Sequence, residues 1–165
     1  MLLRVLNIVV QVTILGALVG IVVSLLTLGF VYGVKEISSF RESYGLCSFV
    51  IFGNCFSYAP LVFLLLSAII ILSVKKTLHI SRYHGPADVI LTAHSNEENL
   101  DPKTGFLSTF AAFVSASGGA SVGQYGPLVH LGGTIGNLIN KFTPGLLSKD
   151  TFIGCWVAAA ISAGF

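Results

Sequence analysis

The chain has 165 residues, of which 54% are hydrophobic and 10% are charged, and its formal net charge is +2. A typical soluble domain carries about 25% charged residues, so this chain has too few to cover a water-facing surface. The composition excludes an ordinary cytosolic enzyme, a disordered segment and a nucleic-acid binder, and it predicts a protein embedded in a lipid bilayer.

Two long uncharged stretches, 5–34 and 43–74, occupy the first half of the chain. A membrane-spanning helix needs about 20 apolar residues, so the first stretch predicts a span at 6–34. Polar residues and glycine interrupt the first half of the second stretch. Because proline is well tolerated at a helix start, we expect the second span at 61–74, directly after Pro60.

Positive residues flank these two spans unevenly. Arg4 precedes the first span, a cluster at Lys75, Lys76 and Arg82 follows the second, and the loop between them has no net positive charge. Cytoplasmic loops are enriched in lysine and arginine. We therefore expect a multi-pass integral protein of the plasma (inner) membrane, with its N-terminus in the cytoplasm. The first apolar segment is too long for a signal peptide and should be retained.

The cysteine and histidine spacings predict no metal or cofactor site. Cys47 and Cys55 fall in or near the loop expected outside, where a disulfide and two free thiols are both open. Cys155 lies in an apolar stretch. There is no C-x-x-C pair, and the four histidines do not have a metal-ligand spacing such as H-E-x-x-H.

The glycine-rich centre carries the main functional signal. A short helix is expected at 86–92 after a turn, and an apolar helix at 105–116. The segment 117–127 then holds four glycines, too many for a stable helix, inside the longest uncharged stretch. Non-helical backbone at membrane depth is tolerated only where protein buries it or where it lines a wet cavity.

A helix is expected to start directly after this glycine-rich segment, at Pro127, and to run over 127–140. A last, apolar helix is expected at 151–165. The N-terminus of a helix offers free backbone N–H groups and about half a positive charge, which favour an anion. The glycine-rich segment and the helix after it therefore predict an anion site.

The segment Gly123-Gln124-Tyr125-Gly126-Pro127 resembles the G-[KR]-E-G-P motif of the chloride channel (CLC) family, which contains voltage-gated chloride channels and chloride/proton antiporters. As in the family, small residues precede the motif, and an apolar helix with closely spaced glycines, 132–136, follows it. A second family motif, G-S-G-x-P-[EAD], matches only at Gly85 and Asp88. The end of the chain, 158–165, is similar to the small-residue helix before the family's Asn-Ala-Pro turn.

The resemblance implies an all-α, polytopic membrane protein with partly spanning helices, corresponding to the N-terminal portion of the family's inverted-repeat fold. It implies chloride as the transported ion, no further cofactor, and a homodimer in the complete protein. The chain is expected to be an N-terminal fragment or a truncated gene product, because the second half of the repeat has no counterpart in it.

The resemblance also gives the expected site residues. In the family, the glutamate of the motif is the gate, and here Tyr125 stands at that position. A phenol is neutral at pH 7 and cannot mimic chloride by charge, although it can donate a hydrogen bond. We therefore expect a passive anion path with weak proton coupling. The residues expected to contact the anion are His84, Gly85, Gly123, Gln124, Tyr125, Gly126 and Pro127.

Two of these residues depart from the family pattern, and one further histidine lies close by. Gln124 replaces a basic residue, and His84 stands where the family has a chloride-coordinating serine. His130 is expected to be a packed or hydrogen-bonded helix residue.

Other interpretations stay open. The chain could be a non-transporting fragment or the assembly partner of a split channel. The run Val122–Gly126 also resembles the potassium filter T-V-G-Y-G, although the inserted Gln124 interrupts it. An enzyme is not expected, because no catalytic triad, P-loop or dinucleotide fingerprint is present.

Overall fold

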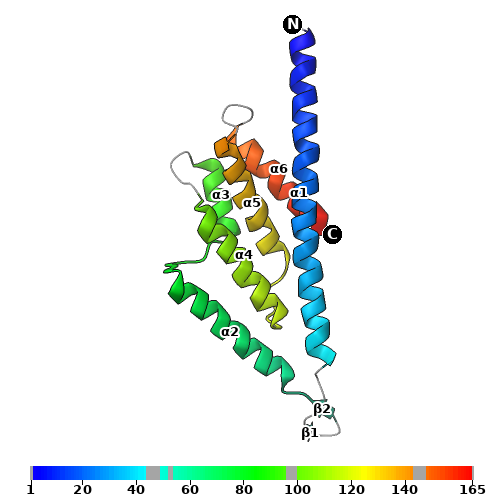
Figure 1. Cartoon of the computed structure of the whole chain (residues 1–165), viewed down its shortest axis with the longest axis vertical. Helices are drawn as coiled ribbons and strands as arrows, with labels where there is room; N and C mark the ends of the chain where they lie inside the picture. Colours follow the sequence, from blue (N-terminus) through cyan, green and yellow to red (C-terminus); the bar gives the residue numbers. More distant parts are fainter. Residues whose placement is uncertain (1, 44–48, 52–53, 96–99, 143–147, 165) are drawn as a thin grey trace.

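A computed structural model describes residues 2–43, 49–51, 54–95, 100–142 and 148–164. These residues form helices and one short hairpin, which confirms the predicted all-α class (Figure 1). The elements in chain order are α1 Leu2–Ser43, β1 Phe49–Ile51, β2 Asn54–Phe56, α2 Ala59–Thr77, α3 Pro86–His94, α4 Pro102–Ser117, α5 Tyr125–Phe142 and α6 Lys149–Gly164.

The first helix is longer than the span expected at 6–34. It begins at Leu2 and continues through the charged residues to Ser43. Charged residues end an apolar stretch without ending a helix, because lysine, arginine and glutamate are all good helix formers. As a result, the N-terminal part of α1 extends well past the other helices in Figure 1.

In the part of the chain that the structure describes, two helices are long and apolar enough to cross a membrane, Gly16–Ser43 within α1 and all of α2. The 19 residues of α2 span about 28 Å at 1.5 Å per residue, close to the thickness of a bilayer's hydrocarbon core. Large apolar side chains cover its surface, with Leu61 60% and Leu72 65% exposed. Helices α1 and α2 contain the two ranges expected to span, 6–34 and 61–74, and that these ranges cross a membrane stays a prediction.

A two-stranded antiparallel hairpin connects α1 to α2, with Val50 opposite Cys55. The sequence predicted only an interrupted stretch at this place. Cys47 lies outside the described residues, so the pairing of Cys47 with Cys55 stays open. Cys155, on α6, is a free and exposed thiol.

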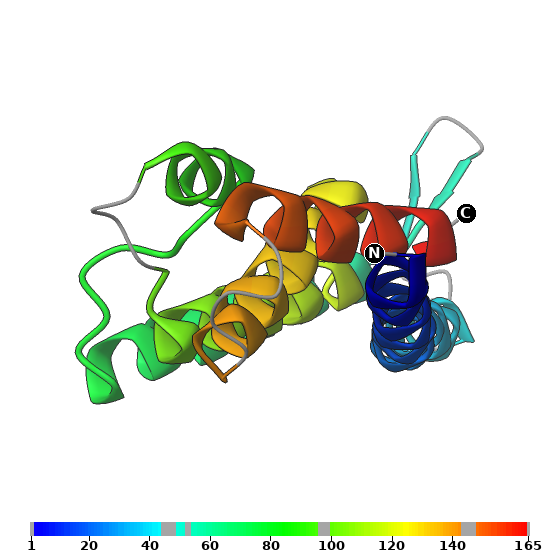
Figure 2. The ribbon, with the colours of Figure 1, turned by 90° about the horizontal axis from the view of Figure 1, so that it is seen from above.

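Helix α5 lies at the centre of the fold, against α3, α4 and α6. Its glycines allow α6 to approach closely: a Cβ atom on Gly132 would lie 2.7 Å from the carbonyl oxygen of Trp156. Figure 2 shows α6 passing over α5 and reaching α1. The main apolar core therefore lies between α1, α5 and α6. Its buried residues are Val19, Val23, Phe30, Val34, Leu128, Leu131, Ile135, Phe152, Trp156 and Ala160.

The helices around the glycine-rich segment begin slightly earlier than expected. Helix α4 starts at Pro102, not at 105, because the Asp101 carboxylate caps it and accepts from the backbone N–H of Thr104 at 3.0 Å. Helix α5 starts at Tyr125, not at 127, so Pro127 falls within its first turn. A proline there breaks no helical hydrogen bond, since the first N–H groups of a helix have no partner within it.

Candidate functional site

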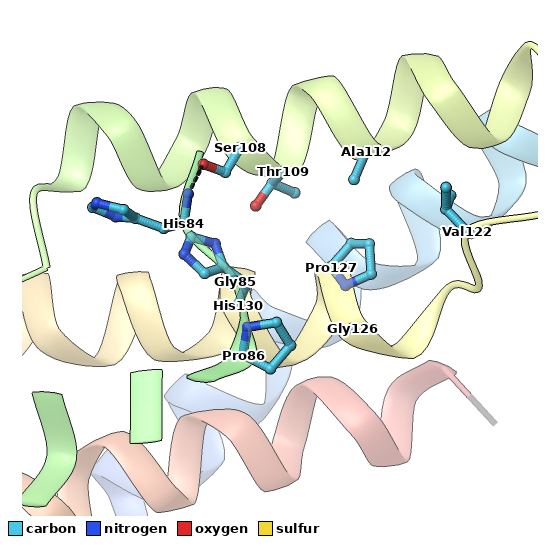
Figure 3. Close-up of a pocket in the computed structure, with 10 residues that line it drawn as sticks. All are labelled: His84, Gly85, Pro86, Ser108, Thr109, Ala112, Val122, Gly126, Pro127 and His130. Carbon is cyan, nitrogen blue, oxygen red and sulfur yellow. Dashed lines mark hydrogen bonds between the residues drawn. The ribbon is translucent and has the colours of Figure 1, made fainter. Parts of the chain in front are cut away.

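A cavity of about 220 Å³ lies between α4 and α5, at the start of α3 (Figure 3). We call it the α4–α5 cavity. Its walls combine apolar side chains with two imidazoles and two hydroxyls. The lining residues are His84, Gly85, Pro86, Ser108, Thr109, Ala112, Val122, Gly126, Pro127 and His130.

The start of α3 is fixed by a reciprocal set of hydrogen bonds. Gly85 is its N-cap residue, and its backbone N–H donates to Oδ2 of Asp88 at 2.7 Å. Arg82 donates to Oδ1 of the same carboxylate at 2.5 Å. The hydrogen bond from Gly85, helped by Arg82 and opposed by partial burial, holds the pKa of Asp88 below its ordinary value. Asp88 is therefore ionised at neutral pH and anchors this turn.

These bonds occupy backbone donors that an anion would otherwise use. The N–H of Gly85 is bonded to Asp88, and the N–H of His84 donates to the hydroxyl of Ser108 at 2.8 Å. With both backbone N–H groups in use, the ring of His84 is the group of these two residues that can still donate a hydrogen bond to an anion. Its Nδ1 is buried and has no hydrogen-bond partner among the described residues.

The α4 wall presents two hydroxyl groups whose hydrogens are already used. Ser108 donates to the carbonyl of Thr104 at 2.7 Å, and Thr109 donates to the carbonyl of Gly105 at 3.2 Å. Hydroxyls that bond back to the preceding turn are common within helices. In this arrangement α4 offers oxygen lone pairs to the cavity, and the hydrogen-bond donors must come from the other walls.

His130 is the polar group most deeply placed in the α4–α5 cavity. It is 2% exposed, and within the described part of the chain neither of its ring nitrogens has a hydrogen-bond partner. Figure 3 shows its ring extending from α5 toward α4. The ring centroids of His130 and His84 lie 6.0 Å apart. Buried polar atoms without partners are rare in proteins, and each calls for an explanation such as a bound ion or water.

His130 is packed, as the sequence predicts, but its ring has no hydrogen bond to any described residue and it faces the cavity. Sequence reasoning left it out of the candidate site. The available signal was its spacing, because His130 follows Gly126 by four residues and so lies on the same helix face.

The seven residues expected to contact an anion separate into two groups in the fold. Four of them line the cavity: His84, Gly85, Gly126 and Pro127. The other three, Gly123, Gln124 and Tyr125, are exposed and lie outside it. Gly123 has a φ of +71°, a left-handed conformation that suits glycine.

Tyr125, at the first position of α5, is directed toward the end of α6. Its side chain is 46% exposed, and a Cβ atom on Gly164 would lie 3.9 Å from its Cε1. No group of three or more metal-ligating side chains comes together among the residues that the structure describes.

The family model described as voltage gated chloride channel matches residues 63–165, more than half of the chain. The matched range includes most of α2, all of α3 to α6 and every residue that lines the cavity. No curated protein and no solved structure matches the chain.

Proposed function

This chain belongs to the voltage-gated chloride channel family, and from that membership we propose that its α4–α5 cavity forms part of a path by which chloride crosses a membrane. Membership and the two apolar helices make it an integral membrane protein with a role in chloride transport at the family level. The expected cytoplasmic N-terminus, plasma-membrane location and homodimer stay predictions.

The observation that carries the proposal is the pairing of a helix N-terminus with unpartnered imidazoles. The cavity is bounded by Gly126 and Pro127 in the first turn of α5, which contains no acidic residue. The partial positive charge at this end of the helix favours an anion. One turn further, His130 offers a ring nitrogen that the described protein does not satisfy. Both features support binding of a small anion.

We propose that the path is passive and that proton exchange is weak or absent. A phenol at position 125 is neutral at pH 7, so it cannot compete with chloride as a carboxylate does. The exposed position of Tyr125, outside the cavity lining, supports this proposal, because the side chain leaves the site open.

The glycine-rich segment needs further protein around it in the working channel. Residues 121–125 are exposed and non-helical up to Gln124, and such backbone is not stable against lipid. We therefore propose that other helices of the channel pack against this segment. On this view the chain contributes one wall of the path, and chloride transport is a property of the assembled protein.

The experiment is chloride efflux from liposomes that contain the purified, assembled channel, followed with a chloride electrode after valinomycin is added. We expect efflux that is not accompanied by uphill proton uptake. The variant Tyr125→Glu places a carboxylate, which is charged at neutral pH, at the gate position and should slow efflux there. Tyr58→Glu makes the same change at a residue that is 60% exposed and is not among those that line the cavity, and it should leave efflux unchanged.

Three outcomes would contradict the proposal. Efflux that drives protons uphill would show that coupling survives without the glutamate. Potassium efflux without valinomycin would favour a cation path. An absence of chloride flux would favour a non-transporting fragment or assembly partner.

A further inference from the structure

Three imidazole nitrogens around the α4–α5 cavity have no hydrogen-bond partner among the residues that the structure describes. They are Nδ1 of His84 and both Nδ1 and Nε2 of His130. A neutral imidazole carries one donor and one acceptor, whereas a protonated imidazole carries two donors. A buried donor or acceptor nitrogen that has no hydrogen-bond partner lowers the stability of the protein. These atoms therefore indicate a ligand or water that bonds to the rings.

The charged groups near this histidine pair lie at the edges of the site. On the α3 side, Asp88 is bonded to Gly85 and Arg82. On the α4 side, Asp101 caps the helix and accepts from Lys103 and Thr104. The buried part of α6 that faces α5 is apolar.

Among the described residues, those that line the α4–α5 cavity include no carboxylate. A positive charge on an imidazole inside the cavity would therefore have no counter-charge among the lining residues. A bound anion would supply that counter-charge, and it would accept the hydrogen bonds that the unpartnered nitrogens can donate.

We propose that the His84–His130 pair makes anion binding in this cavity proton-linked: an anion binds together with a proton that one of the two imidazoles takes up. The identity of the anion as chloride rests on the proposed function. The two rings are 6.0 Å apart, so two positive charges would repel each other in an empty cavity, and one anion offsets that repulsion. By linkage, acid pH then strengthens anion binding, and a bound anion makes the pair more basic.

This linkage is compatible with a passive path. The proton binds and leaves from the same site as the occupancy of the cavity changes, and no step carries it across the membrane. The pair therefore sets the fraction of cavities that hold an anion at a given pH. Exchange of protons across the membrane depends instead on the carboxylate at the gate position, which Tyr125 replaces here.

The test is calorimetric titration of the purified full chain with sodium chloride, in a gluconate medium, at about pH 5.5 and about pH 7.5. Binding that takes up one proton strengthens by up to about tenfold per pH unit, so we expect the dissociation constant to fall at least about tenfold between these conditions. Repeating the titration in two buffers of different ionisation enthalpy at about pH 6 should give an uptake of roughly 0.3 to 1 proton per chloride.

Matched variants identify the histidines. His130→Gln and His84→Gln keep a hydrogen-bonding side chain but remove the imidazole, so on this proposal each should reduce the proton uptake and flatten the pH dependence. His94→Gln is the control, because His94 is exposed at the end of α3 and its Nδ1 lies 2.9 Å from the carbonyl oxygen of Ile90. The His94→Gln variant should bind chloride with the same pH dependence and the same proton uptake as the unaltered chain.

The results separate this inference from the proposed function. Chloride binding with the same affinity at both pH values and no proton uptake overturns the linkage and leaves the chloride site standing. An absence of chloride binding at both pH values contradicts the proposed function itself. The measurement on the unaltered chain decides the linkage even if His130→Gln fails to fold. An uptake that both glutamine variants retain in folded protein assigns the proton elsewhere and overturns the role of the pair.

Discussion

The guanidinium of Arg41 donates a hydrogen bond to the backbone carbonyl of Ser117 at 3.3 Å, although the two residues lie 76 positions apart in the chain. Arg41 is in the last turn of α1, and Ser117 is the last residue of α4. A positive charge at the C-terminus of a helix is favourable because the carbonyls there carry partial negative charge. The bond therefore fixes the point at which the chain leaves α4 for the glycine-rich segment.

Replacing Arg41 with methionine should destabilise the protein by about 1–2 kcal/mol, because the change removes a charged donor from the end of α4. The measurement is the midpoint of denaturant unfolding in detergent. Glu42→Gln is the control: its carboxylate lies 4.0 Å from Arg41 and is 76% exposed, so its loss should cost little. Equal midpoints for Arg41→Met and the unaltered chain would show that the bond contributes nothing.

A second prediction concerns the close approach of α5 and α6. In Gly132→Ala the added Cβ atom would lie 2.7 Å from the carbonyl oxygen of Trp156, so the two helices must separate. We expect a loss of about 1–3 kcal/mol in the free energy of unfolding, as for overpacked cores. The matched control is Gly20→Ala on α1, where a Cβ atom would have no other atom within 4 Å. That change should stabilise α1 by up to about 1 kcal/mol through helix propensity. A neutral Gly132→Ala would mean that the two helices are not held in close contact.

The cap of α4 should give a pH-dependent stability. Hydrogen bonds from the side chain and backbone of Thr104, and from the backbone of Lys103, hold the pKa of Asp101 below its ordinary value. The unfolded chain therefore binds the proton more readily. The cap's contribution is complete above the unfolded pKa of about 3.9 and is lost as the pH falls through the lower folded value.

Asp101→Ala should accordingly cost about 1 kcal/mol at neutral pH and clearly less below about pH 3. Urea unfolding of both proteins across this pH range measures the difference. A difference that stays constant down to the lowest pH would show that the cap does not depend on the charge of Asp101.

The sequence predicted the elements whose signals are local and strong. The uncharged stretch before Lys35 and the apolar run after Pro60 are both helical, and Pro86 starts α3 as expected. The length of α1 could not be predicted from charge, because Lys35 and Arg41 are compatible with both a helix and a loop.

The cavity was harder to predict than the helices, because contacts between distant parts of the chain form it. His84 was singled out from a motif position, but nothing local indicates that its N–H is bonded to Ser108, which lies 24 residues later. His130 was expected to be packed, which it is. Its lack of partners depends on the side chains that α3 and α4 bring near it, and a spacing pattern within α5 carries no information about them.

The bond between His84 and Ser108 leads to a prediction in which stability and affinity change in opposite directions. Ser108→Ala removes the acceptor of the His84 N–H, whose bond is 2.8 Å long, and leaves that donor at the wall of the α4–α5 cavity. Loss of one buried hydrogen bond should lower the free energy of unfolding by about 1–2 kcal/mol. The released N–H can then bond to an anion, so on the proposed function the affinity for chloride should rise severalfold.

Unfolding midpoints and calorimetric titration of the same samples test both halves of this prediction. Thr109→Val is the control on the same wall, because its hydroxyl bonds only to the carbonyl of Gly105 at 3.2 Å, within α4. That change frees no donor, so it should leave chloride affinity unaltered. If Ser108→Ala weakens chloride binding as it weakens the fold, the serine hydroxyl itself holds the anion, and the His84 N–H is not a reserve donor.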